Sequence, residues 1–266
     1  APECHAALER GPHEIALWLE DVQPTEAWSV ERVARTALEL GRAQGTFLAG
    51  RPLPDEPWLS RRWLRAYVES KPARPELLDD EHPVWRLDAV RAAFPPSLRA
   101  RLRRLWAERE RLLALVESLP LTPSHLDFWP ANLVPRGGET VAVDWAFAGL
   151  AALAEDASNL VPDTVADHFL PSSVLPELDA AVYGAYREGL REAGRHGSER
   201  ELRLGYTAAG VKYCWLLPQM LARLSEESEL GAYGGEEAQP LEFVLTERAA
   251  MLELVAGWTE EALADA

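Results

Sequence analysis

Thr122–Gly149 reads TPSHLDFWPANLVPRGGETVAVDWAFAG, and this stretch breaks the helical pattern on either side of it. Gly137-Gly138 is a turn signal, and the β-branched residues of Thr140–Val143 favour a strand behind it. We therefore expect a β-hairpin here. If its turn is centred near the second glycine, positions whose numbers sum to about 276 face each other, which pairs Asn132 with Asp144.

This pairing has a chemical consequence. Asn132 and Asp144 would bring one neutral and one anionic oxygen to the same end of the hairpin. Mg²⁺ prefers few carboxylates and completes its octahedron with phosphate oxygens and water, so the pair predicts a magnesium site. Asp127 comes only five residues before Asn132. It is therefore placed to take the proton of an attacking hydroxyl beside metal-bound phosphates.

The order of these residues is itself informative. His125-x-Asp127 is followed by Asn132 and then, after a predicted strand, by Asp144-Trp145 and Gly149. The set resembles the catalytic and metal-binding loops of the protein-kinase-like superfamily, specifically its aminoglycoside phosphotransferase and choline kinase branch. The simpler alternative is that these side chains cap a helix and close turns, but an ordered set with these spacings seldom arises by chance.

The resemblance implies roles for individual residues. Asp127 would be the catalytic base, Asn132 and Asp144 would bind Mg²⁺, and His125 would be structural. Asp156 matches an aspartate that supports the catalytic loop in the family. ATP and Mg²⁺ are the implied cofactors, and Leu126 stands at a position where glycine is usual among small-molecule kinases.

The N-terminal segment extends the resemblance. The apolar run Glu14–Val22 predicts a strand. It resembles the strand leading into the interlobe hinge of the family, whose backbone groups near Glu20, Asp21 and Val22 would contact adenine. We therefore expect residues 1–24 to be a remnant of the N-terminal lobe with the hinge, and residues 25–266 to be a helical C-terminal lobe.

The family's other nucleotide-binding elements are not visible in this sequence. A glycine-rich loop and a strand lysine are expected before the hinge. Only 13 residues precede Glu14, and the only two lysines, Lys71 and Lys212, come after it. This pattern predicts that most of the N-terminal lobe is absent from this chain.

Most of the remaining chain has helical periodicity. The predicted fold is α+β and predominantly helical, with one short β insertion at its centre. The expected helices span residues 28–47, 58–69, 97–118, 155–169, 176–193, 198–227 with a kink at Pro218, and 242–263.

Composition limits the classes of function. With 266 residues and 47% hydrophobic content the chain is globular. Its net charge of −16 has the wrong sign for nucleic-acid binding. It would suit a cationic substrate, although a solvated acidic surface is the simpler explanation. With no membrane span or signal peptide visible, the sequence predicts a cytoplasmic protein. Cys4 and Cys214 lack metal or disulfide spacing.

Several further side chains are candidates for the acceptor site. Glu155, Asp163 and Asp167 follow the predicted metal loop, where the family builds its acceptor site, and would suit a cationic substrate. His168 with the two aspartates offers a weaker metal-cluster hypothesis, for which a solvated helix face is the alternative.

Aromatic residues near these positions have two interpretations. Tyr213 and Trp215 beside Lys212 are candidates to line an acceptor pocket, although core packing is the simpler prediction. The same holds for Phe128 and Trp129 beside the catalytic loop.

The leading functional hypothesis is transfer of the γ-phosphate of ATP to a hydroxyl of a small molecule. One alternative is a kinase-like binding or regulatory module without catalysis. Another is a metal-dependent phosphoester hydrolase that uses His125, Asp127, Asp144 and His168.

Overall fold

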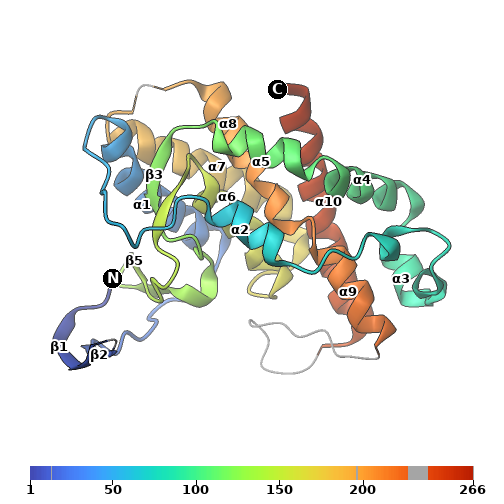
Figure 1. Cartoon of the computed structure of the whole chain (residues 1–266), viewed down its shortest axis with the longest axis horizontal. Coiled ribbons are helices and arrows are strands. Elements are labelled where there is room, and N and C mark those ends of the chain that lie inside the picture. The colour runs from blue at the N-terminus through green and yellow to red at the C-terminus, as the bar shows by residue number, and fades with distance from the viewer. Residues whose placement is uncertain (13, 196, 227–238, 266) are drawn as a thin grey trace.

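The computed structural model describes residues 1–12, 14–195, 197–226 and 239–265. The chain forms a mostly helical α+β fold with small two-stranded antiparallel sheets (Figure 1). The strands are β1 (Cys4–Gly11), β2 (Glu14–Leu19), β3 (Leu121–Ser124), β4 (Leu133–Arg136), β5 (Glu139–Ala142) and β6 (Gly149–Ala152). The α-helices are α1 (Val30–Leu48), α2 (Trp63–Ser70), α3 (Asp88–Ala93), α4 (Pro96–Ala107), α5 (Arg109–Glu117), α6 (Glu155–Ala166), α7 (Leu175–Glu192), α8 (Glu199–Ala208), α9 (Leu216–Ser225) and α10 (Leu241–Asp265).

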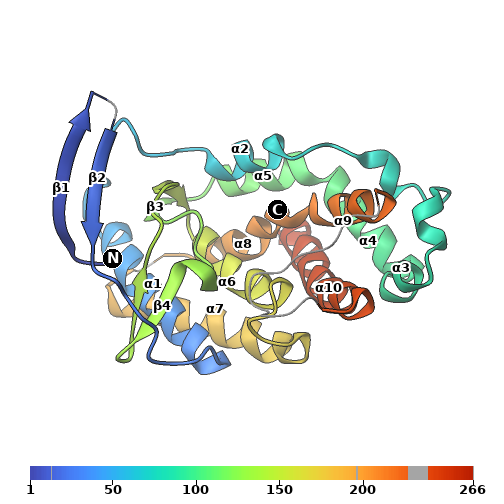
Figure 2. The same cartoon turned by 90° about the horizontal axis from the view of Figure 1, so that it is seen from below.

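The β1–β2 hairpin stands at one edge of the molecule, away from the helical body (Figures 1 and 2). The predicted strand at Glu14–Val22 is β2, which ends three residues earlier than expected and pairs with β1. The hairpin exposes large apolar side chains on both faces, including Ile15, Leu17 and Trp18. Its strands therefore draw little stability from burial, because that stability grows with the apolar area removed from water.

Helices α1 and α7 pack in unusually close contact. Ser29 caps α1 by accepting a hydrogen bond from the backbone N–H of Arg32. A Cβ on Gly41 would lie 2.3 Å from the carbonyl oxygen of Tyr186, and one on Gly189 would lie 2.2 Å from that of Leu38. Only glycine fits at either position, so the two helices pack closely, and α1 also contacts strands β3 and β5.

The central β insertion consists of two strand pairs rather than the single hairpin that the sequence predicts. β4 and β5 form a hairpin whose two turn glycines, Gly137 and Gly138, both have positive φ, at 58° and 80°. β3 and β6 form the second pair. Leu133 faces Ala142, so Asn132 lies opposite Val143 and not Asp144. The predicted register is wrong by one residue because the turn is centred between the two glycines.

The α1 helix holds the β4–β5 hairpin in place. The hydroxyls of Thr36 and Thr140 lie 2.8 Å apart, and the backbone N–H of Thr140 donates to Glu39 at 3.0 Å. At the start of the catalytic loop, Gln44 donates to the Ser124 hydroxyl at 3.0 Å and accepts from the Tyr186 hydroxyl at 2.6 Å. Both sides of the insertion are therefore fixed to one helix.

Two predicted helices are broken. The helix expected over 97–118 is α4 and α5, separated only at Glu108. The helix expected over 198–227 is α8, a 3₁₀ segment at Ala209–Tyr213 and α9. Pro218 lies in the first turn of α9, where a missing N–H costs little, so the predicted kink there is wrong.

A third predicted helix starts later than expected. The helix predicted over 58–69 begins only at Trp63, because Ser60 is engaged in backbone hydrogen bonds to Ala148 and Leu150. This extended segment lies against β6. The apolar core continues from here through the helical body, where α10 packs against α3, α4, α6 and α8. None of the described helices has both the length and the hydropathy that crossing a membrane requires.

Candidate active site

The loop after β3 is held by the first turn of α6. The backbone N–H groups of His125 and Leu126 donate to the two carboxylate oxygens of Asp156 at 2.7 and 2.9 Å. Asp156 is fully buried. Burial raises the pKa of Asp156, while the hydrogen bonds from His125 and Leu126 act in the opposite direction. A single carboxylate thus fixes the backbone immediately before Asp127.

His125 ties this loop to the end of the β4–β5 hairpin. Its Nε2 lies 2.8 Å from the carbonyl oxygen of Val143, and its ring packs against Trp145 at 4.6 Å between centroids. His125 is only 2% exposed. The imidazole therefore connects the two segments that carry Asp127 and Asp144, and its Nε2 is engaged in that connection.

Leu126 adopts a backbone conformation that favours glycine. Its φ is +69°, in the left-handed region, which costs a residue with a Cβ about 1–2 kcal/mol. The side chain is buried against Gly149, where an added Cβ would lie 2.9 Å from Leu126 Cδ1. Burial of a leucine contributes about 1.5–3 kcal/mol, which offsets the strain. Leu126 therefore holds a backbone conformation that glycine would adopt without strain, and its burial compensates for that strain.

Asp127 and Asn132 are in direct contact. Asn132 Nδ2 donates to Asp127 Oδ2 at 2.7 Å and to the carbonyl oxygen of Asp127 at 3.0 Å. Asn132 lies in the 3₁₀ turn Pro130–Asn132 and is largely buried. Because both bonds use Asn132 Nδ2, neither of them involves Asn132 Oδ1 or Asp127 Oδ1.

Asp144 follows β5, directly after Val143, which pairs with Asn132. The backbone N–H of Val143 donates to the carbonyl oxygen of Asn132 at 2.9 Å, so Asp144 begins just beyond that bond. Its φ of +55° turns the chain out of the strand, a conformation that aspartate tolerates well. Asp144 is exposed. An amide oxygen and a carboxylate form a hard-oxygen donor set, which fits Mg²⁺.

One of the predicted hinge residues contacts the β4–β5 hairpin. Glu20 forms an ion pair with Arg136 of β4, which lowers the pKa of Glu20. Asp21 is exposed and accepts a hydrogen bond from Gln23 at 2.8 Å, and Val22 is half-buried. The hinge segment is thus linked to the β4–β5 hairpin through Glu20.

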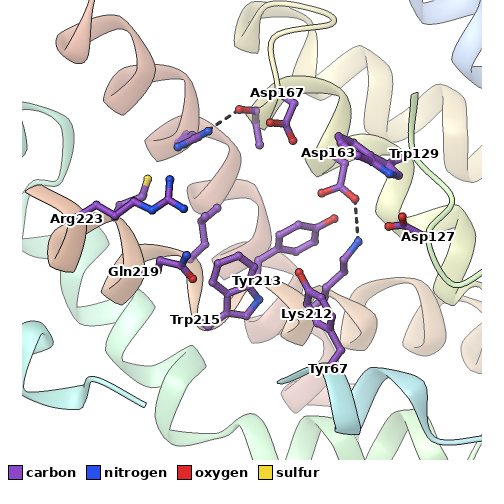
Figure 3. A pocket seen from close by; sticks show the side chains of 14 residues that line it. Tyr67, Asp127, Trp129, Asp163, Asp167, Lys212, Tyr213, Trp215, Gln219 and Arg223 are labelled. Atoms are coloured by element: carbon purple, nitrogen blue, oxygen red, sulfur yellow. Dashed lines mark hydrogen bonds and ion pairs between the residues drawn. The ribbon is translucent and has the colours of Figure 1, made fainter. Parts of the chain in front are cut away.

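A cavity of about 330 Å³ opens beside Asp127 (Figure 3). Its walls come from the catalytic loop, α2, α6, the segment before α9, α9 itself and α10. The lining residues are Tyr67, Asp127, Trp129, Asp163, Ala166, Asp167, Lys212, Tyr213, Trp215, Leu216, Gln219, Met220, Arg223 and Arg248. Its size and its mixture of aromatic and charged groups suit a small polar ligand.

A buried ion pair lies at the Asp127 end of this cavity. Lys212 Nζ lies 2.8 Å from Asp163 Oδ2, and both side chains are at least 87% buried. Burial lowers the pKa of Lys212, but the Asp163 carboxylate and Tyr67, acting together with other neighbours, outweigh it, so the pKa is raised. Asp127 acts in the same direction. Lys212 is therefore a fixed positive charge between two carboxylates.

Comparison with known proteins identifies the family. A family model described as "Phosphotransferase enzyme family" (APH) matches residues 1–196. The chain belongs to this phosphotransferase family. The chain is also similar to the crystal structure of a choline/ethanolamine kinase family protein from Mesorhizobium loti. The match covers 100% of the present chain and 78% of the other, with 17% sequence identity and a TM-score of 0.47. Comparison with curated proteins gave no significant match.

The acceptor candidates of this phosphotransferase separate into two groups. Asp163 and Asp167 line the cavity, whereas Glu155 lies outside it, 4% exposed at the start of α6. Burial, and then the neighbouring Asp156, raise the pKa of Glu155 to about 8. Asp163 does not belong to a solvated helix face, as the simpler prediction had it, because it pairs with Lys212.

His125 and His168, which the hydrolase alternative would need at one site, each contact a different part of the fold. The His168 ring packs against Phe243 at 5.2 Å, whereas His125 binds Val143. Across the described part of the chain, no three histidine, cysteine, aspartate or glutamate side chains are grouped so that they could hold a metal ion. A metal cluster of His168 with Asp163 and Asp167 is thus contradicted.

Some cavity residues were misjudged or missed from the sequence. Trp129 and Trp215 are half-buried and line the cavity, although core packing was the simpler prediction, while Phe128 is buried as expected. Tyr213 is part of the buried core, as predicted, and also borders the cavity. Others went unpredicted altogether: Tyr67, Gln219, Arg223 and Arg248. The sequence did hold one clue to this part of the cavity, namely that the chain has only two lysines, and both of them lie near the ring of Tyr67. Lys71 and Lys212 lie 4.0 and 6.0 Å from the centroid of Tyr67.

Proposed function

We propose that this phosphotransferase moves the γ-phosphate of ATP to a hydroxyl group of a small molecule bound in the cavity beside Asp127. The observation that carries the proposal is the contact between Asn132 Nδ2 and Asp127 Oδ2 at 2.7 Å, at the mouth of that cavity. Asn132 holds one oxygen of the carboxylate. The other is left to accept the proton of the acceptor hydroxyl.

In the proposed reaction, Asp127 is the general base. The acceptor hydroxyl donates its proton to Asp127 as its oxygen attacks the γ-phosphorus. The new O–P bond forms while the bond to the β-phosphate oxygen breaks, and ADP leaves. Asp127 itself changes only its protonation state, so most of the rate enhancement comes from the orientation of the reactants.

We further propose that Asn132 Oδ1 and Asp144 bind Mg²⁺. When bound, the metal ion would neutralise charge on the phosphates of ATP and orient them. His125 and Asp156 support these groups, since their hydrogen bonds fix the backbone around Asp127 and Val143. Residues 1–24 would then provide the hinge that contacts adenine through Glu20, Asp21 and Val22, and residues 25–266 the acceptor-binding lobe.

A transfer assay on the intact protein tests this function. The protein is incubated with ATP and Mg²⁺ against a panel of hydroxylated metabolites, and products are identified by mass spectrometry and ³¹P NMR. We expect a phosphomonoester of at least one acceptor, with ADP formed in equal amount. Hydrolysis of phosphoesters without nucleotide would instead support the hydrolase alternative, and nucleotide binding with no transfer to any acceptor would support a non-catalytic module.

A further inference from the structure

The charged groups around the cavity are arranged with opposite signs at its two ends. The end at the catalytic loop carries two carboxylates, Asp127 and Asp163, and one ammonium group, Lys212. Among the described residues, the far end carries two guanidinium groups, Arg223 and Arg248, and the Asp167 carboxylate. Counted over the described residues that line it, the cavity is negative at the catalytic loop and positive at the far end, although the whole chain has a net charge of −16.

Arg223 lies where a ligand can reach it. It projects from α9 toward the cavity (Figure 3). Together with Gln219 it also borders a smaller hollow of about 170 Å³ that Arg74 lines. In the described part of the chain Arg223 forms no ion pair, whereas Arg74 pairs with Glu226 at 3.6 Å. A guanidinium of this kind can bind an oxyanion through two parallel hydrogen bonds.

Arg248 adds a second, buried positive charge at the same end. It is 7% exposed, and its Nε donates to the carbonyl oxygen of Ala166 at 3.2 Å. Burial and the nearby charge of Arg223 lower the pKa of Arg248, against the opposing effect of Asp167. An oxyanion between the two arginines would add a further favourable interaction with both of them.

Two aromatic rings of the cavity wall already contact a cation of the protein itself, Lys71, which is not among the residues that line the cavity. Lys71 Nζ lies 4.0 Å from the ring centroid of Tyr67 and 4.6 Å from that of Trp215. A cationic ligand would seek such ring faces. Here Lys71 takes up one face of each ring, and its charge would repel a second cation nearby.

We propose that the acceptor is a hydroxylated acid, which places its hydroxyl at Asp127 and its carboxylate or phosphate oxyanion between Arg223 and Arg248. This inference rests on the proposed function. An acidic acceptor differs from the cationic substrate that the net charge of the chain would suit. Within a Debye length of about 8 Å, the groups that line the cavity outweigh the more distant surface charge.

Binding to matched ligands tests the charge preference without requiring turnover. Three series of four to eight carbons are titrated by calorimetry into the intact protein: ω-hydroxy acids, ω-amino alcohols and diols. A fourth arm uses phosphate monoesters of the same diols, which separates carboxylate from phosphate recognition. We expect the best acid or phosphate ester to bind at least tenfold more tightly than the amino alcohol of equal length.

Three variants give the test its control. Arg223→Glu should abolish the preference for acids, and Arg223→Lys should retain part of it. Arg187→Glu makes the same charge change at an exposed site outside the cavity and should leave it intact. Amino alcohols that bind as tightly as acids, no binding of any acid or ester, or an unchanged preference in Arg223→Glu would each overturn the inference. If acids bind as expected but are never phosphorylated, the proposed function fails while the inference about charge stands.

Discussion

The two ends of the cavity are built from very different lengths of chain. Apart from the Lys212–Asp163 ion pair, the catalytic end comes from residues 125–156. There Asn132 donates to Asp127, and Asp156 accepts hydrogen bonds from the backbone of His125 and Leu126. The far end combines Arg223 from α9 with Arg248 from α10, next to the end of α6. In the proposed function, one compact segment therefore carries the reacting groups, while separate helices carry the groups that would select the acceptor. Changes at the catalytic end should slow transfer to every acceptor, and changes at the far end should alter which acceptor binds.

The largest effect short of removing the base is expected at Asp144. Asp144→Asn should lower transfer by more than the roughly 10- to 100-fold that loss of an outer-shell metal partner costs, because it changes a proposed ligand itself. The Mg²⁺ concentration for half-maximal activity should rise as well. Steady-state kinetics across a Mg²⁺ titration measures both quantities. An unchanged Mg²⁺ dependence would remove Asp144 from the metal site.

The next largest effect concerns stability near the boundary between the two ends. Lys212→Met should leave Asp163 buried without its partner and destabilise the fold by about 3–5 kcal/mol. The double variant Lys212→Met/Asp163→Asn removes both charges and should recover most of this loss. Chemical denaturation of the wild type, both single variants and the double variant gives the coupling energy. Additive effects would mean that the pair is not coupled.

The catalytic end could be predicted from the sequence because its main residues lie close together along the chain. Asp127 and Asn132 are five residues apart, so their contact is local and was expected from spacing. Asp144 was expected near them because a two-residue glycine turn limits the hairpin register, although the predicted pairing was one residue out.

The far end was beyond sequence reasoning for a physical reason. Helical periodicity marks Arg223 and Arg248 as residues on helices, but it does not say that α9 and α10 turn these side chains toward the same space as Asp127. Likewise, the 3₁₀ segment between α8 and α9 packs closely against α10, where a Cβ on Gly210 would lie 3.2 Å from the Trp258 ring. Long-range packing of this kind leaves no local pattern.

The smallest of these effects is a pH dependence at Glu155, which belongs to the catalytic segment but lies outside the cavity. Its folded-state pKa of about 8 exceeds the ordinary value of 4.5. Between these values the unfolded chain loses the proton and the folded protein keeps it. Stability should therefore fall as pH rises through this window, by up to about 1.4 kcal/mol per pH unit.

Glu155→Gln checks this sign directly. Glutamine does not titrate, so the variant should gain stability relative to the wild type as pH rises from 5 to 8. Denaturation midpoints at several pH values measure the difference. Glu242→Gln, at an exposed position in α10, serves as the matched control and should track the wild type. Parallel curves for wild type and Glu155→Gln would mean that Glu155 is not protonated in the fold.

The most direct test of the catalytic end is Asp127→Asn in the intact protein. The substitution keeps the size of the side chain but removes the proton acceptor, so the rate of phosphate transfer should fall by about 10²- to 10⁴-fold for every acceptor. ATP and acceptor binding, measured by calorimetry on the same preparation, should stay close to wild type. Full activity, or loss of nucleotide binding together with activity, would contradict the assignment of Asp127 as the base.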